Sequence, residues 1–308
     1  MPSSAPRNFV PPRTFTVTVM AALAATWLIW GSTYFAIKLA LVSLPPLLQM
    51  GSRFMVAGSL LMLFLFCRGG QWPSWVQWRN AVIIGGLMLG GGMGSVGFAQ
   101  QTISSGLAAT MVAAMPVVLA LWRFVLDRQR PGRLEACGIA VGVAGVLMLT
   151  RGQGLAASSI GTLAMLFAIS CWALGSVLSR QRFMLAKGAM GFASEMLAGG
   201  LLLCLAAGLR GEQLSLPIQA SAIAAWIYLV IAGSLIAFSS YMLLLDRVSP
   251  SLATSYCYVN PVVALVIGAS FGHESLSAWE LLSVSVILAA VGLITAAQPK
   301  PLKAARGK

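Results

Sequence analysis

The chain has 308 residues, of which 58% are hydrophobic and only 9% charged, and its mean hydropathy is +0.88. A soluble domain carries about 25% charged residues, so this chain has too little polar surface for a water-soluble globule. The formal net charge of +13 would suit a nucleic-acid partner, but the distribution of the basic residues argues against that partner. The composition predicts a protein whose solvent is largely the lipid bilayer.

Long apolar runs indicate that the membrane-spanning elements are helices. In lipid the backbone must satisfy its own hydrogen bonds, which leaves helices or closed barrels. Barrel strands alternate apolar and polar residues over roughly 10 positions, whereas this chain has continuous apolar runs at 14–37, 81–98 and 136–150. We therefore predict an all-α polytopic membrane protein.

Ten segments come close to the roughly 20 apolar residues that a spanning helix needs. The first is too long for the apolar core of a signal peptide and is expected to be retained. Short loops join the segments, so no soluble domain is expected. In chain order the predicted spans are 16–37, 46–67, 80–98, 104–126, 134–150, 160–178, 189–209, 222–243, 251–271 and 276–297.

The basic residues support this count. With ten spans both termini lie on one side, and that side holds 16 of the 20 lysines and arginines, while the other side holds Lys38, Arg151 and Arg210. Arg53 lies within the second span. Such an excess marks the cytoplasmic side, so both termini are predicted to be cytoplasmic and the charge is a topology signal. The 16 are Arg7, Arg13, Arg68, Arg79, Arg123, Arg128, Arg130, Arg133, Arg180, Arg182, Lys187, Arg247, Lys300, Lys303, Arg306 and Lys308.

An internal repeat is suggested by matches at nearly constant spacing. Trp30 is followed eight residues later by Lys38, and Trp172 eight residues later by Arg180, which gives an offset of 142. Pro116-Val117-Val118 matches Pro261-Val262-Val263 at an offset of 145. The repeats are predicted to cover 17–150 and 158–297.

Because five is odd, the second repeat must enter the membrane from the opposite side. Two inverted repeats are a recurring plan of secondary transporters, with the substrate bound near the bilayer midplane between the halves. We therefore predict a 5+5 inverted repeat that works by alternating access.

Two stretches resemble the fourth-helix signature of EamA-type transporters in the drug/metabolite transporter superfamily. The first is Ser105-Gly106-Leu107-Ala108-Ala109 followed by Met115-Pro116-Val117-Val118, and the second is Ser249-Pro250-Ser251-Leu252-Ala253-Thr254 with Asn260-Pro261-Val262-Val263-Ala264-Leu265. Trp30-Gly31-Ser32 also fits, whereas Gln129 departs from the pattern because the second copy has Glu274 there.

The resemblance covers about residues 17–296. It implies ten helices, an inverted repeat, a bacterial inner-membrane location and export of small metabolites. Within the superfamily the chain is most similar to bacterial amino-acid exporters, including those for aromatic amino acids. Export of other metabolites or of drugs is the alternative.

Aromatic, amide and hydroxyl side chains within the predicted spans or at their ends are the candidate lining of a substrate cavity. Rings combined with a few amides and hydroxyls suit a small amphipathic ligand such as an amino acid. The alternative is anchoring at the membrane interface, above all for Tyr34 and Tyr241. Tyr256 and Tyr258 cannot point the same way on a helix, so at most one is expected to contact substrate. The candidates are Trp30, Tyr34, Gln100, Gln101, Trp172, Tyr241, Tyr256, Tyr258 and Asn260.

Two prolines lie near the middle of their predicted spans. Pro116 and Pro261 each leave the carbonyl four residues earlier, at Val112 and Cys257, without its helical donor. The functional interpretation is a kink that shapes the cavity and lets half-helices move, and the alternative is a static packing kink.

Arg53 and Glu195 are the charged residues well inside predicted spans. An ionisable residue at membrane depth is a functional hypothesis by default. Arg53 could attract a substrate carboxylate and Glu195 could carry a coupling proton, while snorkelling toward headgroups or water is the alternative for both. With so few intramembrane acids, facilitated diffusion stays an open option beside proton coupling.

Two other functional classes find less support. An intramembrane enzyme would need clustered His, Asp or metal ligands, but His273 is the single histidine and falls in a predicted outer loop. A channel would need a continuous polar lining or rings of charge. No metal, cofactor or nucleic acid is expected, so the partners are a small-molecule substrate and the bilayer. The oligomeric state stays open, with a monomer as one option.

Overall fold

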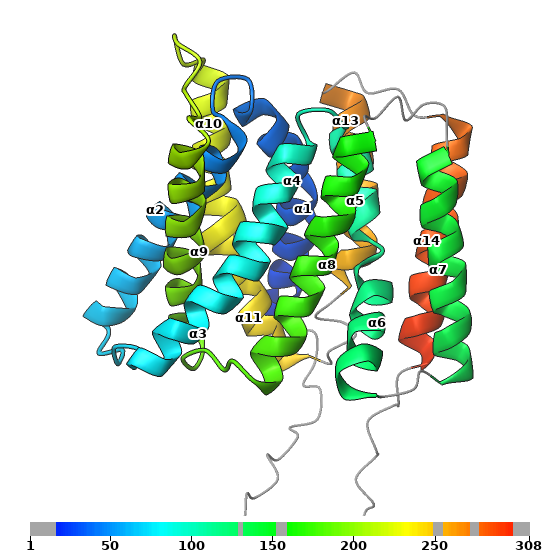
Figure 1. Cartoon of the computed structure of the whole chain (residues 1–308), viewed down its shortest axis with the longest axis horizontal. Coiled ribbons are helices and arrows are strands. Elements are labelled where there is room, and N and C mark those ends of the chain that lie inside the picture. Colours follow the sequence, from blue (N-terminus) through cyan, green and yellow to red (C-terminus); the bar gives the residue numbers. More distant parts are fainter. Residues whose placement is uncertain (1–16, 129–131, 152–158, 249–254, 272–276, 298–308) are drawn as a thin grey trace, which may run out of the picture.

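The computed structural model describes residues 17–128, 132–151, 159–248, 255–271 and 277–297. Within these ranges every regular element is a helix, which confirms the predicted all-α class. The helices stand roughly side by side as a bundle (Figure 1).

The first half of the chain begins with two long helices, α1 (Val17–Ala40) and α2 (Pro46–Cys67). A third rod consists of α3 (Trp75–Gly85), a π-helical segment η1 (Gly86–Met93) and α4 (Gly94–Ala99). Two shorter helices, α5 (Ser105–Val112) and α6 (Met115–Asp127), precede α7 (Arg133–Arg151).

The second half begins with elements of the same kinds in the same order. Two long helices, α8 (Ser159–Gln181) and α9 (Ala189–Leu209), come first. A third rod follows, made of α10 (Ala220–Tyr228), the π-helical segment η2 (Leu229–Ile236) and α11 (Ala237–Arg247). The last described helices are α13 (Tyr256–Phe271) and α14 (Ala278–Ala297).

Seven described helical segments are long and apolar enough to cross a membrane. Three further segments, 136–145, 259–271 and 281–290, are apolar but shorter. The predicted count of ten spans therefore stays a prediction. The seven are Val17–Ala40, Pro46–Cys67, Trp75–Ala99, Ser105–Leu126, Ser159–Gln181, Ala189–Leu209 and Ala220–Leu244.

Helices α2 and α9 pack against each other along their length at one side of the bundle (Figure 1). A Cβ placed on Gly51 would lie 2.8 Å from the Cys204 backbone nitrogen, and one on Gly58 would lie 3.1 Å from the Ala193 carbonyl oxygen. As the residue number rises along α2 it falls along α9, so the two helices are antiparallel. Glycine permits this close approach.

Helices α7 and α14 form a second antiparallel pair at the opposite side of the bundle (Figure 1). Trp279, near the start of α14, donates its indole N–H to the Met148 carbonyl near the end of α7, at 2.7 Å. Further along, a Cβ on Gly142 would lie 3.4 Å from Ala290 Cβ.

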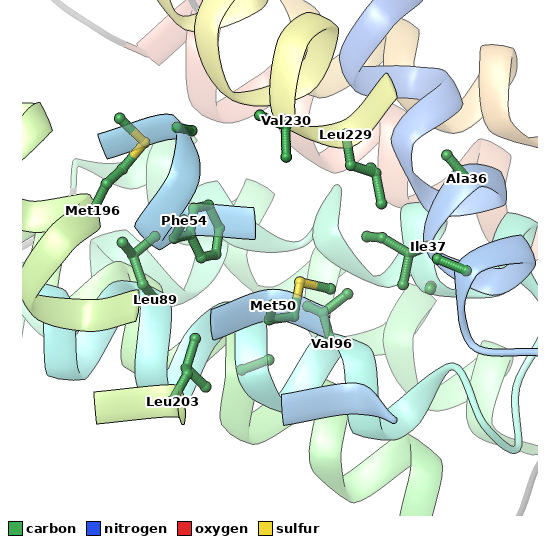
Figure 2. Packing of buried hydrophobic residues seen from close by; sticks show 14 of the residues in the cluster. Ala36, Ile37, Met50, Phe54, Leu89, Val96, Met196, Leu203, Leu229 and Val230 are labelled. Carbon is green, nitrogen blue, oxygen red and sulfur yellow. The ribbon is translucent and has the colours of Figure 1, made fainter. Parts of the chain in front are cut away.

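The buried core lies between α1, α2, the two π-helical segments and α9. Figure 2 shows apolar side chains from all of these elements meeting there, including Ile37, Met50, Phe54, Leu89 and Leu229. The core therefore joins the first and second halves of the chain into one body.

The predicted kink at Pro116 coincides with an interruption of the helix, and the movement of half-helices at this place stays a prediction. Helix α5 ends at Val112 and α6 begins at Met115, so Pro116 lies in the first turn of a new helix. A proline is tolerated there because the first N–H groups of a helix have no intrahelical partner. Pro261 does lie inside a helix, α13, as predicted.

Candidate functional site

Three aromatic rings from three helices form a cluster. Trp30 of α1 lies 5.4 Å from Tyr241 of α11 and 4.7 Å from Tyr256 of α13, between ring centroids, and the two tyrosine rings are 5.6 Å apart. The pairs are tilted or edge-to-face, which are favourable ring geometries. All three rings are half-buried. The structure therefore brings together three of the predicted lining residues, separated by up to 226 positions in the chain.

The indole of Trp30 is also tied to the π-helical segment η2. Its N–H donates to the Gly233 carbonyl at 3.1 Å. One turn earlier on α1, the Trp27 indole N–H donates to the Ser255 hydroxyl at 2.9 Å. These bonds fix the orientation of the ring cluster relative to η2 and to the start of α13.

Asn260 lies one turn from Tyr256 on α13 and is buried. With its amide nitrogen turned toward two carbonyls, it donates to Tyr256 O and to Trp27 O, each at 3.1 Å. The amide therefore joins α13 to α1 beside the ring cluster. Asn260, one of the predicted lining residues, therefore lies beside the ring cluster, where its amide N–H groups bind the Tyr256 and Trp27 carbonyls.

Arg53 is buried inside the bundle, with 4% of its surface exposed, and does not snorkel. Its Nε donates to the Ser234 hydroxyl of η2 at 3.2 Å, and its Cζ lies 4.5 Å from the Phe54 ring centroid. Its Nη1 is buried and has no hydrogen-bond partner among the described residues. Arg53 and Trp30 are thus bonded to neighbouring residues of the same π-helical segment.

Glu195 of α9 is buried to the same extent as Arg53. Its Oε1 has no hydrogen-bond donor, and no carboxylate–cation pair joins it to Arg53, in the part of the chain that the structure describes. The two intramembrane charges are therefore separate features, and snorkelling accounts for neither.

The two predicted glutamines have different environments. Gln100, the residue that ends α4, is buried and donates its amide N–H to the Tyr34 carbonyl of α1 at 2.9 Å. The Gln100 Oε1 is buried with no described partner. Gln101 is exposed in the turn that follows. Tyr34 itself is half-buried and packs against the core.

Trp172 is not one of the three rings of the cluster, which are Trp30, Tyr241 and Tyr256. It is half-buried on α8, where a Cβ on Gly92 would lie 3.2 Å from its ring. The side chains of Tyr258 and Pro116 lie outside the described residues. Of the two tyrosines at the start of α13, Tyr256 is the one that joins the cluster.

Two residues of this region were not singled out from the sequence. Ser234 holds Arg53, and Gln49 of α2 is fully buried, donating to the Ile37 carbonyl at 3.3 Å while its Oε1 has no described partner. Gln49 could have been found from the sequence, because it lies one helical turn before Arg53 in the same apolar span. No local signal distinguished Ser234 from other serines.

The arrangement combines aromatic walls with a desolvated guanidinium and amide groups. No group of three or more His, Cys, Asp or Glu side chains that could hold a metal occurs among the described residues. Aromatic rings with a few polar groups are the side chains expected to line a site for a small amphipathic molecule.

Most of the chain matches one known protein family. The model of the EamA-like transporter family matches residues 17–151 and 159–296. This chain belongs to the EamA-like transporter family. We refer below to the two matched ranges as the first and second segments.

The chain is also similar to several curated proteins over most of its length. It is 43% identical to the uncharacterized inner membrane transporter YedA of Escherichia coli strain K12, over 90% of each chain. It is 28% identical to protein PecM of Dickeya dadantii, over 86% of this chain and 88% of that protein. It is 24% identical to the uncharacterized transporter YoaV of Bacillus subtilis, over 89% and 94%.

A solved crystal structure of another protein has a similar fold. Its TM-score is 0.61 at 21% sequence identity, and the match covers 91% of this chain and 96% of that one. At this identity the likeness concerns the fold alone.

Proposed function

We propose that this chain is an inner-membrane secondary transporter that exports neutral or aromatic amino acids by alternating access. The EamA-like family match and the seven long apolar helices support a membrane transporter. The name of the 43% identical relative, an inner membrane transporter, supports the location. Both termini are proposed to be cytoplasmic, on the distribution of basic residues.

In the proposed mechanism, two oppositely inserted five-helix halves, 17–150 and 158–297, move against each other. The packing of α2 on α9 supports this, because equivalent contacts recur at a spacing of 142 residues. A Cβ on Gly58 would lie 3.1 Å from the Ala193 carbonyl, and a Cβ on Gly200 would lie 3.0 Å from the Gly51 carbonyl. An antiparallel pair with such reciprocal contacts is what a twofold axis in the membrane plane produces.

The π-helical segments support the same duplication. Both η1 and η2 are eight residues long and interrupt the third rod of their half, and Leu229 follows Gly86 by 143 residues. π-helical turns are rare and occur often at functional sites. Both the Trp30 ring cluster and Arg53 are bonded to η2.

The observation that carries the proposal is the three-ring cluster. Trp30 comes from the first segment, whereas Tyr241 and Tyr256 come from the second. A substrate stacked on these rings would contact both halves, so its binding would be sensitive to their relative movement. Aromatic walls favour an amino acid with an apolar or aromatic side chain.

An intramembrane enzyme is the weaker candidate. It would need a nucleophile with a base or a set of metal ligands at membrane depth. Instead, the polar groups described at the site are amides, a guanidinium and the hydroxyls of a serine and two tyrosines, which suit binding.

Transport by purified protein in proteoliposomes tests the proposal. We expect saturable uptake and counterflow of tryptophan, phenylalanine or leucine without an imposed pH gradient. Trp172→Ala and Asn260→Ala should each reduce uptake at normal protein levels. Trp75→Ala is the matched control, because the Trp75 side chain is 84% exposed at the start of α3.

The competing results are distinct. Uptake of amino acids no faster than in empty liposomes would overturn the proposed substrate class. A flux that does not saturate and shows no counterflow would indicate a channel.

A further inference from the structure

Four buried polar side chains gather between α1, α2, α4 and η2. Gln49, Arg53, Gln100 and Ser234 are exposed by 0%, 4%, 2% and 3%, respectively. We call these four residues the Arg53 cluster. Three of the four buried polar atoms without a partner in the described chain belong to it: Gln49 Oε1, Arg53 Nη1 and Gln100 Oε1.

The hydrogen bonds place the members of the cluster close together. Gln49 and Arg53 are one turn apart on one face of α2. Gln49 donates to the Ile37 carbonyl at 3.3 Å and Gln100 to the Tyr34 carbonyl at 2.9 Å. Because these carbonyls are also one turn apart on α1, the two amides lie next to each other along that helix.

The same bonds determine which atoms are left for a ligand. Each glutamine uses an amide N–H on α1 and keeps its Oε1 as an unmet acceptor. Arg53 uses Nε on Ser234 and keeps Nη1 as an unmet, charged donor. Leaving a buried polar atom unpaired is costly, and more so for a charge. A ligand that supplies two N–H donors and one anionic acceptor would remove that cost.

The surroundings strengthen such an interaction. The Phe54 ring lies 4.5 Å from Arg53 Cζ, and the Leu229 carbonyl accepts from the Ser234 hydroxyl at 3.1 Å. Both residues belong to the buried apolar core that Figure 2 shows. Low polarity raises the energy of each charge–charge and charge–dipole contact relative to water.

The Arg53 cluster adjoins the three-ring cluster through η2. Trp30 donates to the carbonyl of Gly233, and Arg53 donates to the hydroxyl of the next residue, Ser234. A ligand with a charged head and an aromatic side chain could therefore contact both clusters at once.

We propose that the Arg53 cluster is the head-group site for an α-amino acid. The Arg53 guanidinium binds the carboxylate, and the Gln49 and Gln100 carbonyl oxygens accept hydrogen bonds from the ammonium group. This assignment rests on the proposed function and adds the chemistry of recognition to it. An amine alone would face the guanidinium with a like charge, and a carboxylate alone would leave both amide oxygens unmet.

Analogues that each lack one charged group test the assignment. In proteoliposomes that take up L-phenylalanine, phenethylamine lacks the carboxylate and 3-phenylpropionate lacks the ammonium group. We expect each analogue to compete with L-phenylalanine uptake at least roughly tenfold more weakly than unlabelled L-phenylalanine does, because buried polar groups reject a ligand that leaves them unpaired.

Variants test which side chain recognises the carboxylate and which recognises the ammonium group. Arg53→Gln should lower L-phenylalanine uptake at least roughly tenfold and abolish the preference over phenethylamine. Gln49→Met, which keeps the side-chain length, should abolish the preference over 3-phenylpropionate. Arg68→Gln, on the exposed C-terminal end of the same helix, is the matched control and should transport like the wild type.

Folding is followed separately, by monodispersity and thermal stability in detergent. If Arg53→Gln does not fold, Gln49→Met and the analogue competition on the wild type still test the head-group assignment. Wild-type liposomes that take up no amino acid would overturn the proposed function. Wild-type uptake combined with equal competition by both analogues, or with folded Arg53→Gln within twofold of wild type, would overturn the head-group assignment alone.

Discussion

Helices α2 and α9 pack against each other as antiparallel neighbours but carry opposite charges. Glu195 follows Arg53 by 142 residues, the same spacing that separates Trp30 from Trp172, and both charges are buried. Arg53 has a hydroxyl partner in η2, Ser234, whereas the Glu195 Oε1 has no described partner. Two segments of one family can thus share a helical frame and still differ in the chemistry placed on it.

The backbone also differs between the two segments at the corresponding prolines, Pro116 and Pro261. Met115 precedes Pro116 and has no side-chain N–H or O–H to donate. The helix is interrupted there, between α5 and α6. Asn260 precedes Pro261, and its amide donates to the Tyr256 and Trp27 carbonyls while α13 continues. Asn260 therefore ties α13 to α1 beside Pro261, a contact that the Met115 side chain cannot make.

The largest effect is expected where the two segments make reciprocal contacts. Gly58→Leu and Gly200→Leu should each destabilise the folded protein by at least about 1–3 kcal/mol, because the added side chains meet α9 or α2 backbone near 3 Å. Thermal unfolding in detergent measures both. Gly208→Leu is the control, since a Cβ there meets nothing within 4 Å. Clearly unequal losses at Gly58 and Gly200 would contradict the equivalence of the segments.

Exchanging the residue before the proline should have the next largest effect. Asn260→Leu removes the two amide hydrogen bonds to the Tyr256 and Trp27 carbonyls, each worth about 0.5–1.5 kcal/mol, while the helical N–H donors to those carbonyls stay. We expect lower thermal stability together with reduced transport. Met115→Leu at the corresponding place in the first segment should change neither. A stable and active Asn260→Leu protein would show that α13 does not depend on this amide.

The two repeat-related tryptophans should differ in their effect on affinity. Trp30→Ala removes one ring on which the proposed substrate would stack; such a ring pair is worth about 0.5–1.5 kcal/mol, so the KM for L-tryptophan should rise roughly two- to tenfold. Trp172→Ala, which loses packing on Gly92, should raise it less. Concentration-dependent uptake measures both, with Trp75→Ala as control. The reverse order would place the substrate nearer to α8 than to the ring cluster.

The smallest effect is expected at Glu195. Glu195→Gln keeps the shape of the side chain and removes its ionisation, and the Oε1 has no described donor to lose. Gradient-free counterflow should stay within about twofold of the wild type, in contrast to Arg53→Gln. If a pH gradient stimulates the wild type, that stimulation should disappear in Glu195→Gln. A collapse of gradient-free counterflow would give Glu195 a role beyond proton coupling.

The sequence by itself determined the helical class, the positions of the long apolar helices and many of the candidate residues. The predicted bounds 46–67 and 189–209 agree with α2 and α9, because Pro45 and Gly188 precede their starts and polar residues follow their ends. Trp30, Tyr241 and Tyr256 were expected at the site because aromatic rings, combined with a few amides and hydroxyls, suit a small amphipathic ligand.

Only the tertiary structure decided which residues meet. Trp30 and Tyr256, and Arg53 and Ser234, lie more than 180 positions apart and are brought together by helix packing. The physical reason is that a helix in lipid is apolar on every side, so hydropathy gives its length but not which face turns toward lipid and which toward a neighbouring helix. The hydrogen bond of Arg53 to Ser234 followed from those contacts and could not be read from local sequence.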